Sequence, residues 1–186
     1  MLAADIFAQF RNLLLVLGAF AAIAPTVSGD EPAPRRSQSR FEVNFMQDMI
    51  DHHNMAVMMA GLCEDRAIHE ELLALCDQIA TSQSAEIEDM QAWLHDWYGI
   101  NYEPEMTKQM QRQLASLASL SGAQFEIAFM EMMIEHHSTA IKEGRQCVRK
   151  AYHEELIDLC ENIMATQSME IMLMEMWLCD WYDRCD

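Results

Sequence analysis

The chain has 186 residues, of which 30 are Asp or Glu and 12 are Lys or Arg, so its formal net charge is −18. Its 51% apolar content excludes a disordered chain, and 6 Gly and 4 Pro are too few for the regular turns of a β-sandwich or barrel. The negative charge argues against nucleic acid and anionic membrane surfaces as partners. We therefore expect a helical protein, rich in soft metal donors because it has 17 Met, 7 His and 6 Cys.

The N-terminus contains an apolar run, Leu13–Ala24, that is too short to span a bilayer but suits the core of a signal peptide. We expect residues 1–29 to be a signal peptide cleaved after Gly29, and residues 30–38 to be a flexible leader. An uncleaved anchor or a buried helix is the alternative, because Asp5 lies where a signal peptide is normally positive. Export would place the protein in the periplasm or outside the cell.

An internal repeat covers most of the remaining chain. A shift of 84 residues aligns FEVNFMQDMIDHHNMAV with FEIAFMEMMIEHHSTAI, and no gap is needed from Phe41 to Tyr98. We expect a single domain over residues 39–186, built from repeat one (39–99), a connector (100–120) and repeat two (121–186).

Each repeat has the apolar periodicity of two helices joined by a turn. Capping boxes predict that the first helices start near Ser39 and Ser121, and Gly99 suits the end of a second helix. The connector predicts a shorter amphipathic helix over 105–120. Because each hairpin is too small to fold alone, the sequence predicts an all-α, ferritin-like four-helix bundle with a pseudo-twofold axis.

Methionine and histidine recur on the inner stripe of both first helices. If the first hairpin turns near residue 66, His53 is expected beside Ile79 and Met49 beside Gln83. Core packing by Met and buried structural His are the alternatives, but the coincidence in both halves favours a metal site, for which thioether and imidazole donors suit Cu(I) or Cu(II). The candidate ligands are Met46, Met49, His52, His53 and His69, with their twins Met130, Met133, His136, His137 and His153.

The six cysteines admit disulfides or metal ligation. They form three pairs close in sequence: Cys63 and Cys76, Cys147 and Cys160, and Cys179 and Cys185. The first two spacings do not place the thiols directly opposite one another across the predicted turns, and the third pair meets only if the last helix frays. Cys63 and Cys147 are also expected near His69 and His153, so pairing and ligation both stay open.

Enzyme motifs are missing from the sequence. No Glu stands three residues before any His, which disfavours the Glu-x-x-His motif of di-iron bundles. HExxH, GxSxG, glycine-rich phosphate loops and calcium-binding loops are also absent. We therefore expect no catalytic activity.

Several motifs together resemble a known family. They are MIDHH and MIEHH, then HEEL, Q-S-x-E-I and M-x-x-W-L-x-x-W-Y, between Phe41 and Tyr182. This pattern resembles the ferritin-like family called domain of unknown function 305, whose duplicated, exported, methionine-rich form includes a cyanobacterial periplasmic copper-binding protein. The resemblance implies a four-helix bundle that binds copper through the paired histidines and neighbouring methionines, and that protects cells from excess copper.

The two halves differ in soft donors. Met55, Met58 and Met59 correspond to Thr139, Lys142 and Glu143, so the first half is predicted to be the softer site, with these three methionines mostly in packing roles.

The leading hypothesis is a periplasmic or secreted protein that sequesters copper ions or hands them on, with a copper efflux or sensor protein as a candidate receiver. Neither nucleic acid nor membrane contact beyond the signal segment is expected, and the oligomeric state is open. The alternatives are a structural or interaction bundle without functional metal, and a metal-dependent redox enzyme of ferritin-like ancestry.

Overall fold

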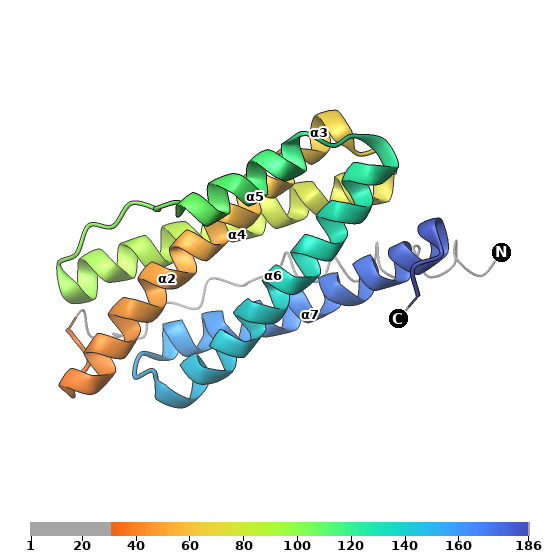
Figure 1. Ribbon diagram of the computed structural model, residues 1–186. Coiled ribbons are helices and arrows are strands. Elements are labelled where there is room, and N and C mark those ends of the chain that lie inside the picture. The colour runs from red at the N-terminus through yellow and green to blue at the C-terminus, as the bar shows by residue number, and fades with distance from the viewer. Residues whose placement is uncertain (1–30, 186) are drawn as a thin grey trace.

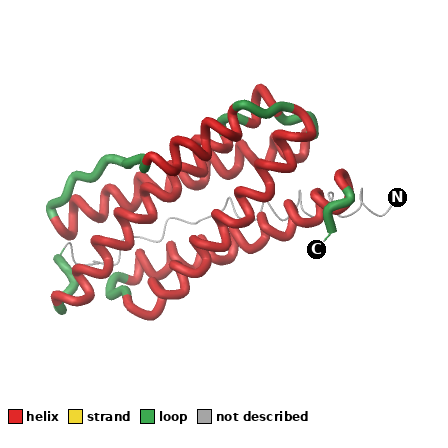
Figure 2. Tube along the Cα trace, in the orientation of Figure 1, coloured by secondary structure: helices red, strands yellow, loops and turns green. Residues whose placement is uncertain are grey.

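The computed structural model describes residues 31–185, and within them it contains helices and loops but no strand (Figure 2). This confirms the predicted all-α bundle. No helix in this range is long and apolar enough to cross a membrane. The predicted signal peptide lies outside the described residues. The helices are α2 (Arg36–Ala60), α3 (Cys63–Arg66), α4 (Glu70–Tyr98), α5 (Lys108–Ala118), α6 (Gly122–Lys150) and α7 (Glu154–Tyr182).

Two helical hairpins form the bundle (Figure 1). Helix α2 packs along α4 in the first hairpin, and α6 packs along α7 in the second. The hairpins meet mainly where α2 crosses α6, and the connector helix α5 lies against both of these helices. The junction of α2, α5 and α6 therefore brings together all three parts of the predicted domain.

The predicted start near Ser121 is confirmed, because α6 begins at Gly122, whereas α2 begins earlier than predicted. Helix α2 begins at Arg36, so Ser39 lies inside it and its hydroxyl donates to the carbonyl of Ala33 at 2.8 Å. Ser121 precedes α6, but its side chain makes no capping hydrogen bond. The expected leader is thus partly helical, and Ala33 is buried. The cap at Gly99 is confirmed, because this residue has φ +66° and its N–H donates to a carbonyl at the end of α4.

The predicted register of the hairpins is wrong by about two helical turns. His53 lies beside Glu86, seven residues beyond the expected Ile79, with 2.7 Å between the imidazole Nε2 and the carboxylate Oε2. The two hairpins turn later in the sequence than predicted, because helical backbone continues through Arg66 in α3 and through Lys150 in α6, and the loops that follow are residues 67–69 and 151–153.

The later turns place Cys63 opposite Cys76 and Cys147 opposite Cys160, contrary to the sequence-based expectation. All six cysteines are in disulfides, and no thiol is free to ligate a metal. The bonds join Cys63 to Cys76, Cys147 to Cys160 and Cys179 to Cys185.

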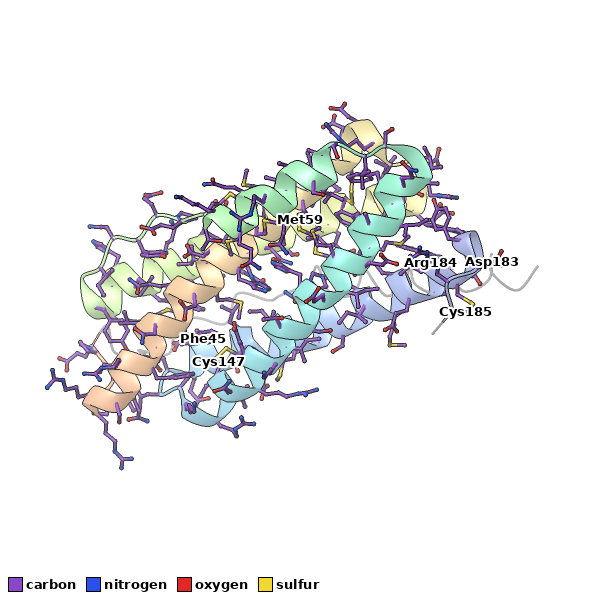
Figure 3. The ribbon with its side chains drawn as sticks, viewed as in Figure 1. Phe45, Met59, Cys147, Asp183, Arg184 and Cys185 are labelled. Carbon is purple, nitrogen blue, oxygen red and sulfur yellow. A yellow bond between two sulfur atoms is a disulfide. The ribbon has the colours of Figure 1, made fainter. Side chains whose placement is uncertain are left out.

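The predicted inner stripe is largely buried. Met46, Met49, Ile50 and His53 have no exposed surface, whereas Val57 is half-buried. The buried side chains form two apolar clusters, one on each side of the α2–α6 crossing. Figure 3 shows Phe45 and Cys147 close together in the second cluster, near the end where α2 begins.

Candidate metal centre

Two histidines from opposite halves meet at the α2–α6 crossing. His52 on α2 and His136 on α6 occupy twin positions of the repeat, so the pseudo-twofold axis brings their rings face to face. The ring centroids are 3.5 Å apart and the planes are tilted by 30°. Nδ1 of His52 and both ring nitrogens of His136 are buried and have no hydrogen-bond partner among the described residues. Unpartnered buried nitrogens of this kind are free to bind a ligand.

Both rings are held neutral. Burial, together with the nearby rings of His53 and His137, lowers the pKa of His52 from 6.5 to about 3. Burial and the same neighbouring rings also hold the pKa of His136 well below its ordinary value. Because a metal binds the neutral imidazole, protons do not compete for these nitrogens at physiological pH.

A pocket of about 340 Å³ opens beside this histidine pair. Four methionines line it: Met55 and Met59 from α2, Met110 from α5 and Met132 from α6. Figure 3 shows Met59 at the junction of α2 with α5. The polar side of the lining is formed by Glu135 and Thr139 of α6, by Thr107, which caps α5, and by Gln109 and Gln113 within α5. The pocket therefore combines thioether sulfur with neutral imidazole.

The second histidine of each pair points into its own hairpin. Adjacent residues on a helix differ in direction by about 100°, so one ring reaches the pocket and the next one faces the core. His53 contacts Glu86, and Nε2 of His137 lies 2.7 Å from Oε2 of Glu170. Both imidazoles are completely buried. These pairs place a second layer of polar groups behind the pocket.

Two buried glutamines continue that layer. Gln83 and Gln167 lie three residues before Glu86 and Glu170 on α4 and α7, and hence on the same helix faces. Their amide groups have no hydrogen-bond partner among the described residues. The middle of the bundle is therefore unusually polar.

His69 lies away from the pocket, in a network centred on Glu126. The Glu126 carboxylate accepts hydrogen bonds from the backbone N–H of Ile68 at 2.6 Å and of His69 at 2.8 Å, and from the hydroxyl of Tyr182. Its other contact is with Nδ1 of His69 at 2.6 Å, while that ring stacks on Trp181 with centroids 3.9 Å apart. We call this network the Glu126 latch.

His153 occupies the twin network, the Glu42 latch. Glu42 accepts from the N–H groups of Tyr152 and His153 at 2.5 and 3.0 Å, and from the hydroxyl of Tyr98. Nδ1 of His153 lies 2.7 Å from the same carboxylate, and the ring stacks on Trp97 with centroids 3.8 Å apart. Each latch joins the first helix of one repeat to the hairpin turn of the other.

The two latch glutamates are ionised. Burial alone would raise the pKa of Glu42, but hydrogen bonds from Tyr98, from two backbone N–H groups and from His153 outweigh burial and lower it. The pKa of Glu126 is lowered by the equivalent balance. The sequence analysis missed both carboxylates, although each lies on the inner stripe one turn before Met46 or Met130.

The predicted methionine ligands lie elsewhere in the core. None of them has exposed surface or lines the pocket: Met46, Met49, Met130 and Met133. The pocket instead uses methionines that the sequence analysis assigned to packing or overlooked. Their only signal in the sequence is the asymmetry of the repeat, since Met55 and Met59 have Thr139 and Glu143 as twins and Met132 has Asp48.

The chain matches the family model for domain of unknown function 305 (DUF305) over residues 42–178. The chain belongs to this family. No curated protein sequence matches this DUF305 chain.

Solved structures of similar fold include metal-bound forms of one DUF305-like protein. CopM in the Cu(I)-bound form has a TM-score of 0.69 and 28% identity, with 76% of this chain and 97% of CopM covered. CopM in the Cu(II)-bound form has a TM-score of 0.68, with the same identity and coverage. A DUF305 protein from Streptomyces coelicolor, described as secreted, has a TM-score of 0.67 and 26% identity over 75% of this chain and 91% of that protein.

Proposed function

We propose that this protein binds copper at the junction of α2, α5 and α6, through His52, His136 and the methionines that line the adjacent pocket. The observation that carries the proposal is the pair of neutral imidazoles with unpartnered buried nitrogens beside four thioethers. A buried nitrogen without a hydrogen bond costs stability unless a ligand occupies it. The similarity to CopM, which has been solved with Cu(I) and Cu(II), supports the same ligand.

The donor chemistry favours Cu(I) over harder ions. Thioether and imidazole groups select soft cations, whereas Ca²⁺ and Mg²⁺ require clustered oxygen ligands. Within residues 31–185, no three His, Cys, Asp or Glu side chains are placed to hold a metal ion by themselves. Thioether sulfur must therefore complete any donor set at the histidine pair. The candidate donors are His52, His136, Met55, Met59, Met110 and Met132.

The surroundings of the proposed copper site suit storage or transfer of copper rather than catalytic turnover. Two imidazoles and four thioethers around the pocket supply enough donors to bind a soft ion through protein ligands alone. Three disulfides favour an oxidising compartment, in agreement with export to the periplasm or the medium. The proposed role is sequestration of copper, or its transfer to another protein, outside the cytoplasm.

Titration of the full chain with Cu(I), in competition with a chromogenic Cu(I) chelator, tests the site. The His52→Ala/His136→Ala variant is expected to lose the tightly held ion. The His95→Ala variant is the matched control, because His95 is exposed and lies on the outside of α4. Unchanged Cu(I) stoichiometry and affinity in the double variant would reject the proposed centre.

A second variant tests the contribution of the thioethers to copper binding independently of the histidines. Met110→Leu/Met132→Leu keeps the apolar volume of the pocket but removes two sulfur atoms, so Cu(I) binding should weaken more than Cu(II) binding. The melting temperature of wild type should rise when Cu(I) is added, because a ligand of the native state stabilises it by mass action. Circular dichroism establishes that each variant is folded before its titration is interpreted.

A further inference from the structure

Positive charge gathers at one end of this acidic molecule. Of the 12 Lys and Arg in the chain, six lie where α2 begins and α6 ends, and all six are exposed. We call this region the basic end, and Figure 3 shows nitrogen-tipped side chains pointing outward there. The residues are Arg35, Arg36, Arg40, Arg145, Arg149 and Lys150.

The basic side chains are organised on two neighbouring helices. Arg36 and Arg40 are four residues apart on α2, as are Arg145 and Arg149 on α6, so each pair shares a helix face. Nζ of Lys150 lies 5.2 Å from the centre of the Phe41 ring, which brings the end of α6 against the start of α2. The tertiary structure thus merges two separate runs of basic sequence into one surface.

The basic end has no ion-pair partner among the described residues. Within residues 31–185, none of these six cations makes an ion pair within 4.0 Å; the Lys or Arg that does so is Arg184, with Glu131. Arg36 and Arg40 stand in the first turns of α2, where the helix dipole favours anions, whereas Arg149 and Lys150 stand in the last turn of α6, where it favours cations. The charge of all six side chains is therefore available to an external anion.

The acidic remainder of the surface does not cancel the basic end. Helices of this length are about 40 Å long, several times the Debye length of about 8 Å at physiological ionic strength. Glu154 and Glu155 in the first turn of α7 and Glu31 before α2 are acidic residues at this end, whereas Glu42 is buried in its latch. The six cations outnumber these three carboxylates, so this end presents net positive charge to an approaching anionic surface.

We infer that the basic end binds the surface of a membrane that contains anionic lipids. Phosphate headgroups complement two adjacent rows of guanidinium groups. Beside them Tyr152 is 48% exposed, and an aromatic ring with a polar hydroxyl suits the headgroup layer.

Cosedimentation of the full chain with lipid vesicles tests this inference. One set of vesicles contains phosphatidylcholine alone, and the other contains equal parts of phosphatidylcholine and phosphatidylglycerol. The N-terminal apolar run contributes equally to both, so the preference for anionic vesicles reports the basic end. Wild type should prefer the anionic vesicles, and high salt should remove that preference.

Charge-reversal variants locate the contact. Arg36→Glu/Arg40→Glu and Arg145→Glu/Arg149→Glu should each reduce the preference by about tenfold or more, since each basic side chain near an anionic bilayer contributes about fivefold. The matched control is Lys108→Glu/Arg112→Glu, which changes the net charge equally on the exposed face of α5. Equal losses in control and test variants would overturn the inference. So would a wild type that shows no preference among vesicles, which is the result expected if the basic end serves an acidic protein instead.

Discussion

The two halves of the molecule repeat one another in their cross-links but not in their pocket. Both halves carry a disulfide at the hairpin turn, a buried histidine–glutamate pair and one glutamate latch, at positions 84 residues apart. The pocket takes Met55 and Met59 from the first half, where the second has Thr139 and Glu143.

This difference indicates a division of labour. The duplicated disulfides and histidine–glutamate pairs join the helices within each hairpin, and the two latches bind the halves to each other across the pseudo-twofold axis. The proposed copper site lies near that axis, at the His52–His136 pair, but draws two methionines from the first half, one from the second and one from the connector. The contacts that both halves share therefore stabilise the fold, whereas the methionines that differ between the halves supply thioether donors to the pocket.

The largest expected loss of stability comes from replacing a latch glutamate, which both halves contain. Glu42→Gln should lower the free energy of unfolding by about 3 kcal/mol, because the neutral amide loses charge-assisted hydrogen bonds and brings an N–H donor against two backbone N–H groups. Glu126→Gln should cost a similar amount, and urea denaturation measures both. Glu88→Gln, on the exposed face of α4, is the control and should stay within about 0.5 kcal/mol of wild type. A latch variant as stable as this control would contradict the assigned role.

A decrease in pH is expected to lower the free energy of unfolding through the histidine pair at the α2–α6 crossing. His52 has a pKa of about 3 in the folded protein and about 6.5 when unfolded, so only the unfolded state takes up protons between these values. Stability should therefore fall as pH decreases from 6.5 towards 3, by at most about 1.4 kcal/mol per pH unit for each such ring. The latch carboxylates, whose pKa is lowered, add a loss only below their ordinary value of 4.5.

Chemical denaturation of wild type and of His52→Leu/His136→Leu between pH 7 and 5 isolates the histidine contribution. The variant should lose most of the slope in this window and keep the acid unfolding below it. A slope that is identical in both proteins would show that the two rings do not titrate with folding.

The smallest change is expected in Cu(I) affinity, when a pocket residue of one half is replaced by its twin from the other half. Met55→Thr gives the first half the residue of the second, and it should weaken Cu(I) binding by about tenfold through loss of one thioether. Thr139→Met adds a thioether at the twin position, which also lines the pocket, and should strengthen binding. Competition titration with Cu(I) measures both changes.

The buried methionines provide the comparison for that exchange. Met46→Leu and Met130→Leu conserve volume in the core, so stability should change by less than about 1.5 kcal/mol and Cu(I) affinity should not change. A loss of copper in these variants, with Met55→Thr unaffected, would place the ligands on the inner stripe instead of in the pocket.

Local patterns predicted much of the fold. The duplication, the stripe containing Met49 and His53, and the cap at Gly99 all follow from spacing along one chain segment. The register did not, because apolar periodicity does not record that the hairpins turn at residues 67–69 and 151–153. For the same reason the facing of Cys63 and Cys76 was predicted incorrectly.

The candidate site was predictable only in outline. Adjacent histidines at twin positions marked the α2–α6 crossing, but their identical spacing does not reveal which ring faces the pocket and which contacts a glutamate. His69 and His153 are histidines like those at the pocket, yet each contacts a carboxylate of the opposite repeat. Such contacts join residues more than fifty positions apart, beyond the reach of any helical pattern.

The sequence by itself determined the repeated helical hairpins, the paired histidines and the excess of soft donors, because helical periodicity and composition are properties of contiguous residues. Only the tertiary structure decided which methionines reach the histidines, that every cysteine is bonded, and that six cations of an acidic chain share one end. The physical reason is that turn length and helix crossing set the register between distant segments, and one residue of register rotates a side chain by about 100° around its helix.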